Sequence, residues 1–141
     1  MQSGVTFGTF HSYRAWGLML SKRPVISPPE PKYKLIEVPG SDAVIDLTEA
    51  LAGTVTYRPR EIKCEFVTKE SRERWAEIHS AVMNAIHGKR LQIVMDNDPD
   101  YYYIGRITVG EMQNEKGIMT LPIMATVEPY KYERYGDGRK L

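Results

Sequence analysis

Residues 88–106 read GKRLQIVMDNDPDYYYIGR, and this stretch decides how the rest of the chain is interpreted. It opens with Gly88, a residue suited to ending a helix, and continues with a strand-like segment, an acidic turn and three tyrosines. β-Branched and aromatic residues on both sides of residues 96–100 favour two strands joined by a turn. The one convincing helix lies upstream and the last pair of strands downstream. The stretch therefore predicts a mainly β, antiparallel architecture.

The acidic turn contains three alternating carboxylates, Asp96, Asp98 and Asp100. A calcium loop that began at Asp96 would need Gly at position six and Glu at position twelve, but these positions hold Tyr101 and Ile107. A turn in which Asp and Asn side chains bond their own backbone is the simpler interpretation. We therefore predict no metal, cofactor or catalytic residue. A carboxylate- or metal-dependent hydrolase or nuclease stays open as an alternative, because these carboxylates could hold a divalent ion.

Composition narrows the class of protein. The chain has 141 residues, enough for one domain with a single core. Its 19 Lys and Arg residues balance 18 Asp and Glu residues, so no overall field draws it to nucleic acid or to an anionic membrane. No apolar run is long enough for a membrane span, and the start does not resemble a signal peptide. The single cysteine, Cys64, excludes an internal disulfide, and its alternating context favours a buried structural thiol over a nucleophile.

One helix is predicted at about residues 69–87, because Trp75, Ile78, Val82 and Ile86 form an apolar stripe at helical spacing. Strands are predicted within residues 4–20 and at 33–38, 43–47, 53–57, 61–68, 91–95, 101–109 and 118–127. Runs of strands interrupted once by a helix favour an antiparallel β-sandwich or open barrel with one flanking helix. Residues 1–130 are expected to form this single domain, and residues 131–141 a mobile or partner-bound tail.

Other motifs add little chemistry. No Gly-rich phosphate loop, nucleophile elbow, paired-histidine helix or paired-cysteine motif is present, which argues against an enzyme. Residues 101–103 are tyrosines on alternating strand faces, and a small module that stacks single-stranded nucleic acid on them remains a second alternative. Residues 23–31 contain four prolines, which exclude a central strand and predict either a rigid loop or an extended arm that a neighbouring subunit contacts.

The order of several segments resembles a known family. These segments are GLMLS at 17–21, VPGSD at 38–42 followed by IDL at 45–47, YRPR at 57–60, the helix end at Gly88-Lys89, residues 96–105, and ATVEPY at 125–130. No one of them is specific, but their order and spacing together resemble the distal tail protein family of long-tailed, siphovirus-type phages. The resemblance covers nearly the whole chain.

This resemblance implies a fold and a role. Members are β-sandwiches with one flanking helix, related to tail-tube proteins, and six copies close into a ring that joins the tail tube to the tail-tip hub and adsorption apparatus. The tape-measure protein and then the genome pass through the pore without specific binding. The expected location is the tip of a virion tail, assembled in the host bacterial cytoplasm. A prophage or a phage-derived tail particle is equally compatible.

The resemblance also implies a short form. Many members carry a carbohydrate-binding-like domain on the C-terminal side, whereas this sequence stops soon after Glu128-Pro129-Tyr130. A ring of identical subunits needs two different complementary surfaces on each copy. We predict that contacts between subunits or with neighbouring tail proteins come from the proline-rich segment, the acidic turn and the C-terminal tail. The residues singled out are Pro24, Pro28, Pro29, Pro31, Asp96, Asp98, Asp100, Tyr130 and Tyr132.

Overall fold

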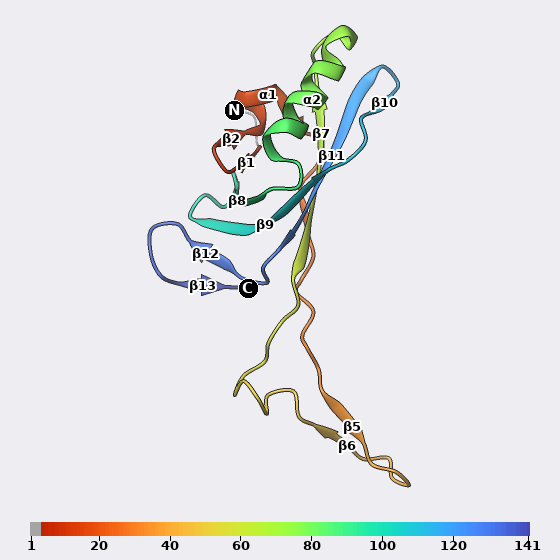
Figure 1. The fold of residues 1–141 in the computed structure, drawn as a ribbon, viewed down its shortest axis with the longest axis vertical. Coiled ribbons are helices and arrows are strands. Elements are labelled where there is room, and N and C mark those ends of the chain that lie inside the picture. The colour runs from red at the N-terminus through yellow and green to blue at the C-terminus, as the bar shows by residue number, and fades with distance from the viewer. Residues whose placement is uncertain (1–3) are drawn as a thin grey trace.

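A computed structural model describes residues 4–141 as one curled antiparallel sheet from which a long hairpin departs (Figure 1). The main sheet has the central strand order β2-β1-β8-β9-β11-β7-β3, with β4, β10, β12 and β13 paired at its margins. Its strands are β1 (Val5–Phe7), β2 (Phe10–His11), β3 (Leu18–Leu20), β4 (Val25–Ile26), β7 (Arg60–Thr68), β8 (Arg90–Met95), β9 (Tyr101–Val109), β10 (Gln113–Glu115), β11 (Ile118–Val127), β12 (Lys131–Glu133) and β13 (Arg139–Lys140). The departing hairpin pairs β5 (Leu35–Glu37) with β6 (Val44–Asp46).

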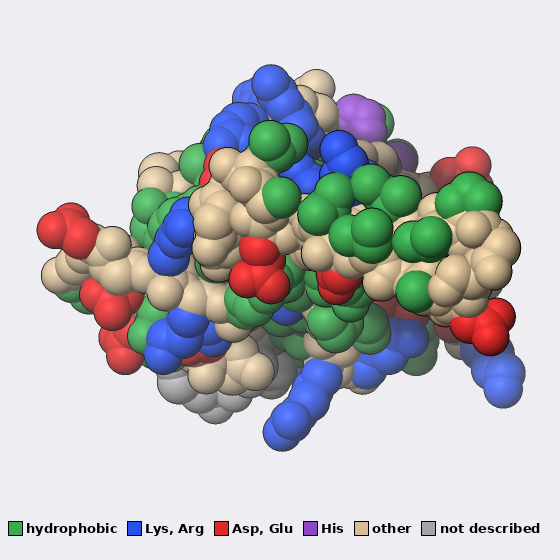
Figure 2. Space-filling view, turned by 90° about the horizontal axis from the view of Figure 1, so that it is seen from below, with side chains coloured by type: hydrophobic (Ala, Val, Ile, Leu, Met, Phe, Trp, Pro, Cys, Tyr) green, Lys and Arg blue, Asp and Glu red, His purple; other side chains and the backbone are tan. Residues whose placement is uncertain are grey.

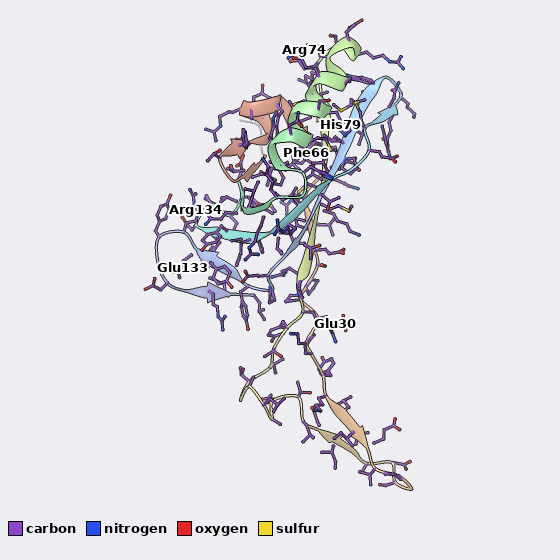
Figure 3. The ribbon with its side chains drawn as sticks, viewed as in Figure 1. Glu30, Phe66, Arg74, His79, Glu133 and Arg134 are labelled. Carbon is purple, nitrogen blue, oxygen red and sulfur yellow. The ribbon has the colours of Figure 1, made fainter. Side chains whose placement is uncertain are left out.

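The main sheet curls until its two ends approach each other. Phe7 on β1 and Phe66 on β7 belong to strands separated by β8, β9 and β11, yet their ring centroids lie 6.3 Å apart in an edge contact. Helix α2 (Trp75–Ile86) packs on the concave side with Trp75, Ile78, Val82 and Ile86 buried, and Phe66 lies in the same interior (Figure 3). The apolar stripe read from the sequence is therefore the core face of the helix, and the mainly antiparallel β fold class is confirmed.

Strand alternation separates the core from the outer face. On β7, alternate residues from Arg60 to Thr68 are buried, and β9 and β11 continue the pattern with buried residues such as Ile107 and Ile123. The intervening residues point to the convex face. Exposed side chains occupy this face, including Met124 on β11 and Val25 on β4. The body is thus a half-barrel with one buried side.

Several local predictions are revised by the structure. The helix is shorter than residues 69–87, because a 3₁₀ turn (Arg72–Arg74) precedes α2; Gly88 follows it with φ +76°. A second, short helix, α1 (Ser12–Trp16), was not predicted. Residues 53–57 form no regular strand and contribute one isolated bridge.

Residues 33–47 and 131–141 are also arranged differently from the prediction. The strands read at 33–38 and 43–47 exist in shortened form, but they pair only with each other, outside the main sheet. Residues 131–141, expected to be a mobile or partner-bound tail, form the hairpin β12–β13, and β12 pairs with the start of β9. Among the described residues, no helix is long and apolar enough to cross a membrane.

A glycine at the centre of the sheet permits a close strand contact. At Gly105 on β9, an added Cβ would overlap the carbonyl oxygen of Thr126 and the backbone of Val127 on β11. We expect Gly105→Ala to lower the free energy of unfolding by about 1–3 kcal/mol, because the clash is with backbone that cannot rotate away. Denaturant melts would measure this. Thr108→Ala, at an exposed position of the same strand, should stay within about 0.5 kcal/mol; equal effects would contradict the steric explanation.

Candidate interaction surfaces

Residues 27–59, here called the arm, extend from one end of the half-barrel (Figure 1). The arm leaves the body just after β4 and returns at Arg60, the first residue of β7. Glu30 lies near its root, where the chain narrows away from the body (Figure 3). The distal part contains the β5–β6 pair, joined by a turn with Gly40 at φ +77°. The Pro-Gly dipeptide therefore makes the turn that the sequence indicated.

A buried arginine fixes the root of the arm. Arg60 is 9% exposed; its Nε donates to the carbonyl oxygen of Ser27 at 2.9 Å, and its Nη1 donates to that of Pro129 at 3.1 Å. Its guanidinium also lies 5.8 Å from the ring centroid of Tyr103. Ser27 is the first residue of the arm and Pro129 precedes the C-terminal hairpin. One side chain therefore ties the arm and that hairpin to the same point of the sheet.

Backbone hydrogen bonds then continue along the root. The amide of Arg58 donates to the carbonyl of Glu30 at 2.8 Å, and that of Lys32 donates to Thr56 at 2.9 Å. Pro31 bridges to Tyr57 between these bonds. The arm is therefore paired near its root and again at the β5–β6 tip, with the turns and bends of residues 48–54 between these two places on the returning side.

Residues 35–53, here called the distal arm, expose large apolar side chains on both faces of the β5–β6 pair. Ile36 lies directly opposite Ile45 on one face, where they are 43% and 48% exposed. Leu35 and Val44 belong to the opposite face, and both are exposed as well. Viewed from the end of the arm, hydrophobic side chains gather across the near face of the molecule with acidic side chains among them (Figure 2). Apolar groups in this number are typical of a surface that another molecule covers.

The same part of the arm is strongly acidic. Residues 35–53 contain Glu37, Asp42, Asp46 and Glu49 but no Lys, Arg or His. Asp46 accepts hydrogen bonds from the backbone and hydroxyl of Thr48, which lowers the pKa of its carboxyl group. The distal arm therefore presents an apolar and anionic surface at neutral pH.

The carboxylates of the acidic turn have separate partners. Asp98 pairs with Lys131 Nζ at 2.6 Å, and Asp96 binds elsewhere, to Gly4 and His11. The side chain of Asp100 has no hydrogen-bond partner among residues 4–141, although its carbonyl accepts from Arg134. No group of three His, Cys, Asp or Glu side chains that could hold a metal ion occurs in the described part of the chain. The turn is thus a structural link to the C-terminal hairpin.

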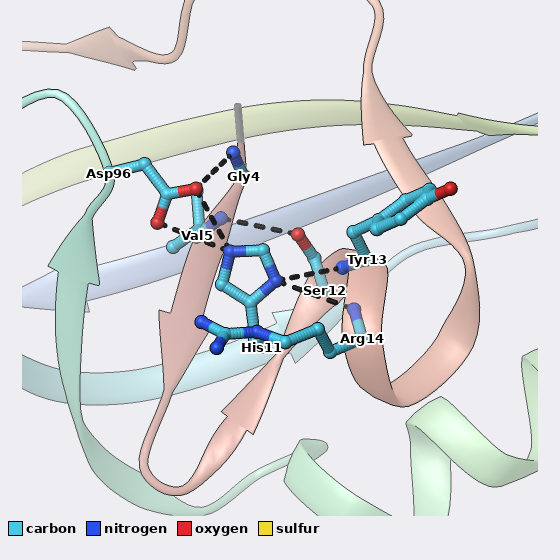
Figure 4. Close-up of polar contacts among 7 residues, drawn as sticks. All are labelled: Gly4, Val5, His11, Ser12, Tyr13, Arg14 and Asp96. Carbon is cyan, nitrogen blue, oxygen red and sulfur yellow. Dashed lines mark hydrogen bonds and ion pairs between the residues drawn. The ribbon is translucent and has the colours of Figure 1, made fainter. Parts of the chain in front are cut away.

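A histidine–aspartate pair holds the start of the chain (Figure 4). His11 Nδ1 accepts from the amides of Tyr13 at 3.2 Å and Arg14 at 3.4 Å, so it caps α1. Nε2 must then carry the proton, and it donates to Asp96 Oδ2 at 2.9 Å, which also accepts from the Gly4 amide at 2.8 Å. Both ring nitrogens are occupied, so His11 has no free nitrogen to act as a general base. No short sequence spacing signals this pair, because its members are 85 residues apart.

The tyrosines around β9 pack against the C-terminal hairpin. Tyr101 lies beside the paired residues Lys131 and Lys140, whose Nζ atoms are 4.8 and 4.7 Å from its ring centroid. Tyr102 packs on Tyr132 at 5.7 Å, and Tyr103 is buried. These contacts engage rings that stacking on single-stranded nucleic acid would require to be free. The geometry therefore disfavours that alternative.

Eight of the nine residues singled out from the sequence fall into two groups, and Asp96 lies apart from both, bonded to Gly4 and His11. Pro28, Pro29 and Pro31 lie at the root of the arm, with Pro24 shortly before it, whereas Asp98, Asp100, Tyr130 and Tyr132 meet around the C-terminal hairpin. Tyr130 connects the groups through an edge contact with Tyr57 at 6.1 Å. Tyr132 donates to Glu128, which lowers the pKa of Glu128 and raises that of Tyr132. Sequence reasoning missed the distal arm as a contact surface, because its β-branched and aliphatic residues are those of an ordinary core strand.

Comparisons with known proteins identify the fold. No protein-family model matches the chain, and no curated protein matches it. Among solved structures, it is similar to the Dit protein of phage SPP1, described as a paradigm of the hub adsorption apparatus in phages that infect Gram-positive bacteria. The TM-score is 0.71 at 12% identity, over 94% of this chain and 53% of that chain. The chain thus spans about half the length of that protein, and the likeness shows a shared fold.

The Asp96 contacts lead to a stability prediction. We expect Asp96→Ala to lower the free energy of unfolding by about 1–3 kcal/mol, because it removes the acceptor for the Gly4 amide and for His11 Nε2. Asp100→Ala is the matched control and should change it by less than about 0.5 kcal/mol. Urea melts of both variants would measure the difference. Equal losses would show that the turn, rather than the histidine contact, carries the effect.

The buried thiol leads to a prediction on reactivity. Burial raises the pKa of the Cys64 thiol to about 12, and the thiolate is the reactive form. We expect a thiol reagent at pH 8 to modify native Cys64 roughly a thousandfold more slowly than the unfolded chain, since thiolate at an unperturbed pKa of about 8.5 is that much more abundant. Absorbance of the released chromophore would follow both reactions. Comparable rates would mean that Cys64 is accessible in solution.

Proposed function

We propose that this chain is a structural component of a phage tail: a distal tail protein whose copies close into a ring between the tail tube and the tail-tip adsorption apparatus. The observation that carries the proposal is the arm, which projects uncovered apolar side chains from a body similar in fold to a phage hub protein. The role is assembly rather than catalysis, on a phage or prophage tail.

The arm supports a role in assembly because it is poorly suited to water. A lone two-stranded ribbon is at best marginally stable, and its unpaired strand edges invite further pairing. Burying one exposed Leu or Ile side chain contributes about 1.5–3 kcal/mol. A neighbouring subunit that covered the distal arm would therefore stabilise both the arm and the assembly.

A ring also agrees with the shape and charge of the chain. An arm that reaches away from its own body is a head-to-tail device, and repeated head-to-tail contacts close into a ring when the rotation permits. Six copies are proposed from the resemblance of the sequence. The near-neutral charge of the chain, +1, suits a pore through which the tape-measure protein and the genome pass without specific binding.

Contacts with neighbours are proposed at two places besides the distal arm. The first is the proline-rich root, at Pro24, Pro28, Pro29 and Pro31. The second is the joined surface of the acidic turn and C-terminal hairpin, at Asp96, Asp98, Asp100, Tyr130 and Tyr132. Tail-tube and tail-tip hub proteins are the proposed partners there.

The arm proposal predicts a specific loss of assembly. In light scattering at several concentrations, with negative-stain images of the large species, we expect the wild-type chain to form ring-shaped oligomers. Leu35→Ser combined with Val44→Ser should weaken association at least tenfold, because the apolar area that the neighbour covers is lost. Ile118→Ser removes an isoleucine of similar exposure, 51%, outside the arm and should leave association unchanged. A wild-type chain that stays monomeric would contradict self-assembly of the ring.

A further inference from the structure

The distal arm has one face that combines both of its chemical properties. The register pairs Leu35 with Asp46 and Glu37 with Val44, so these four side chains share a face of the ribbon. The other face carries the Ile36–Ile45 pair. Since residues 35–53 contain no cationic residue, nothing within the distal arm neutralises this apolar and acidic face. A surface that received it would need apolar area beside positive charge.

The convex face of the half-barrel carries a pair of arginines of which one has no anionic partner among the described residues. Arg90 on β8 lies directly opposite Arg106 on β9, and like charges in that position destabilise a sheet. Arg90 has a carboxylate partner, Glu128 Oε2 at 2.6 Å. Arg106 has none among residues 4–141 and donates to the carbonyl of Gly88 at 3.2 Å. With Glu128 counted, the two arginines keep one positive charge, whereas the ammonium of Lys89 is turned toward the carbonyl of Asn84 on α2.

Apolar side chains lie in the neighbouring row of the same face. Met124 on β11 lies opposite Thr108 on β9 and opposite Lys63 on β7, and Lys63 in turn lies opposite Val25 on β4. Met124 is 40% exposed and Val25 is 55% exposed. Arg106 follows in the next row, because it pairs with Thr126 two residues beyond Met124. Glu61 lies in that row as well, opposite Thr126, and pairs with Lys63 at 3.9 Å. We call the surface formed by Val25, Lys63, Met124, Arg90 and Arg106 the convex strip; its three cations outnumber the neighbouring carboxylates, Glu61 and Glu128, by one.

We propose that the convex strip of one copy receives the acidic face of the distal arm of a second copy. Charge complementarity and the apolar rows of both surfaces support this pairing. The arm cannot serve its own strip without folding back, because it points away from the body (Figure 1). Since the two surfaces differ, the contact is head-to-tail, as a ring requires. This inference rests on the proposed function and adds the identity of the acceptor.

A second basic surface, on the C-terminal hairpin, is already engaged. In the C-terminal hairpin, Lys131 pairs with Asp98, Arg139 lies 4.1 Å from the ring centroid of Tyr130, and Lys140 lies over Tyr101. An arm that docked there would have to displace these contacts. The convex strip also contains two ion pairs, Arg90 with Glu128 and Lys63 with Glu61, but its Arg106 has no carboxylate partner among residues 4–141 and is open to an incoming one.

Charge reversal on each side tests the pairing. Association of the full chain would be measured by sedimentation velocity over a range of concentrations. Arg106→Glu and Glu37→Lys should each raise the apparent dissociation constant at least tenfold, because each variant brings like charges together across the contact. Mixing the two variants should restore association to within about threefold of wild type, since acidic arms then meet basic strips and reversed arms meet reversed strips. Lys69→Glu is the control for a charge reversal elsewhere and should have no effect.

Each outcome decides the question. If the single variants associate weakly and their mixture recovers, the acceptor assignment is supported; if the mixture does not recover, it is overturned. Thermal melts of the single variants would establish that both remain folded. Rings that form equally well with Arg106→Glu would overturn the acceptor while leaving the ring proposal intact. A wild-type chain that never associates would overturn this inference and the ring together, because the arm would then have no second copy to bind.

Discussion

The ladder between β7 and β11 is the interaction on which the rest of the structure depends. It runs from Arg60 opposite Val127 to Thr68 opposite Met119, joining segments more than fifty residues apart. Its inward residues supply the centre of the core, and the strands that curl the sheet attach at its sides. Its first residue is also the anchor of the arm. Because both the arm and the C-terminal hairpin start at this end of the ladder, a single buried guanidinium can fix the origin of each.

Local sequence patterns predicted the secondary-structure elements whose formation depends on nearby residues. The apolar stripe of α2, its end at Gly88 and the alternating strands around Cys64 follow from spacing alone, because each places one face toward a core. For the half-barrel, the sequence predicted the fold class but not the curvature of the sheet. Its curvature depends on contacts such as Phe7 with Phe66, which join strands at opposite ends of the order.

The remaining features could not be predicted because their causes lie far apart in the sequence. Helix α1 is only five residues long and depends on the His11 cap, and His11 is itself oriented by Asp96. The distal arm poses the reverse problem. Leu35, Ile36, Val44 and Ile45 are residue types typical of strands, so the sequence is correct about the strands, yet the structure leaves all four side chains exposed. A sequence pattern records that a face is to be covered, but it does not say whether the cover comes from the same chain.

The distribution of charge also favours a cover for the arm that comes from another copy of the chain. The formal charge of +1 excludes a strong overall field, but it is the difference between unlike regions: residues 35–53 carry −4, which leaves +5 for the rest of the chain. A monomer gains nothing from separating its charges by the length of an arm, since attraction between the two regions is largely screened beyond about 8–10 Å. In the head-to-tail assembly that we propose, the acidic arm of one copy rests on the body of the next, which carries the +5. In the proposed assembly the separation of charge within one copy becomes attraction between copies, which would account for a segment that holds four of the 18 acidic residues and no basic one.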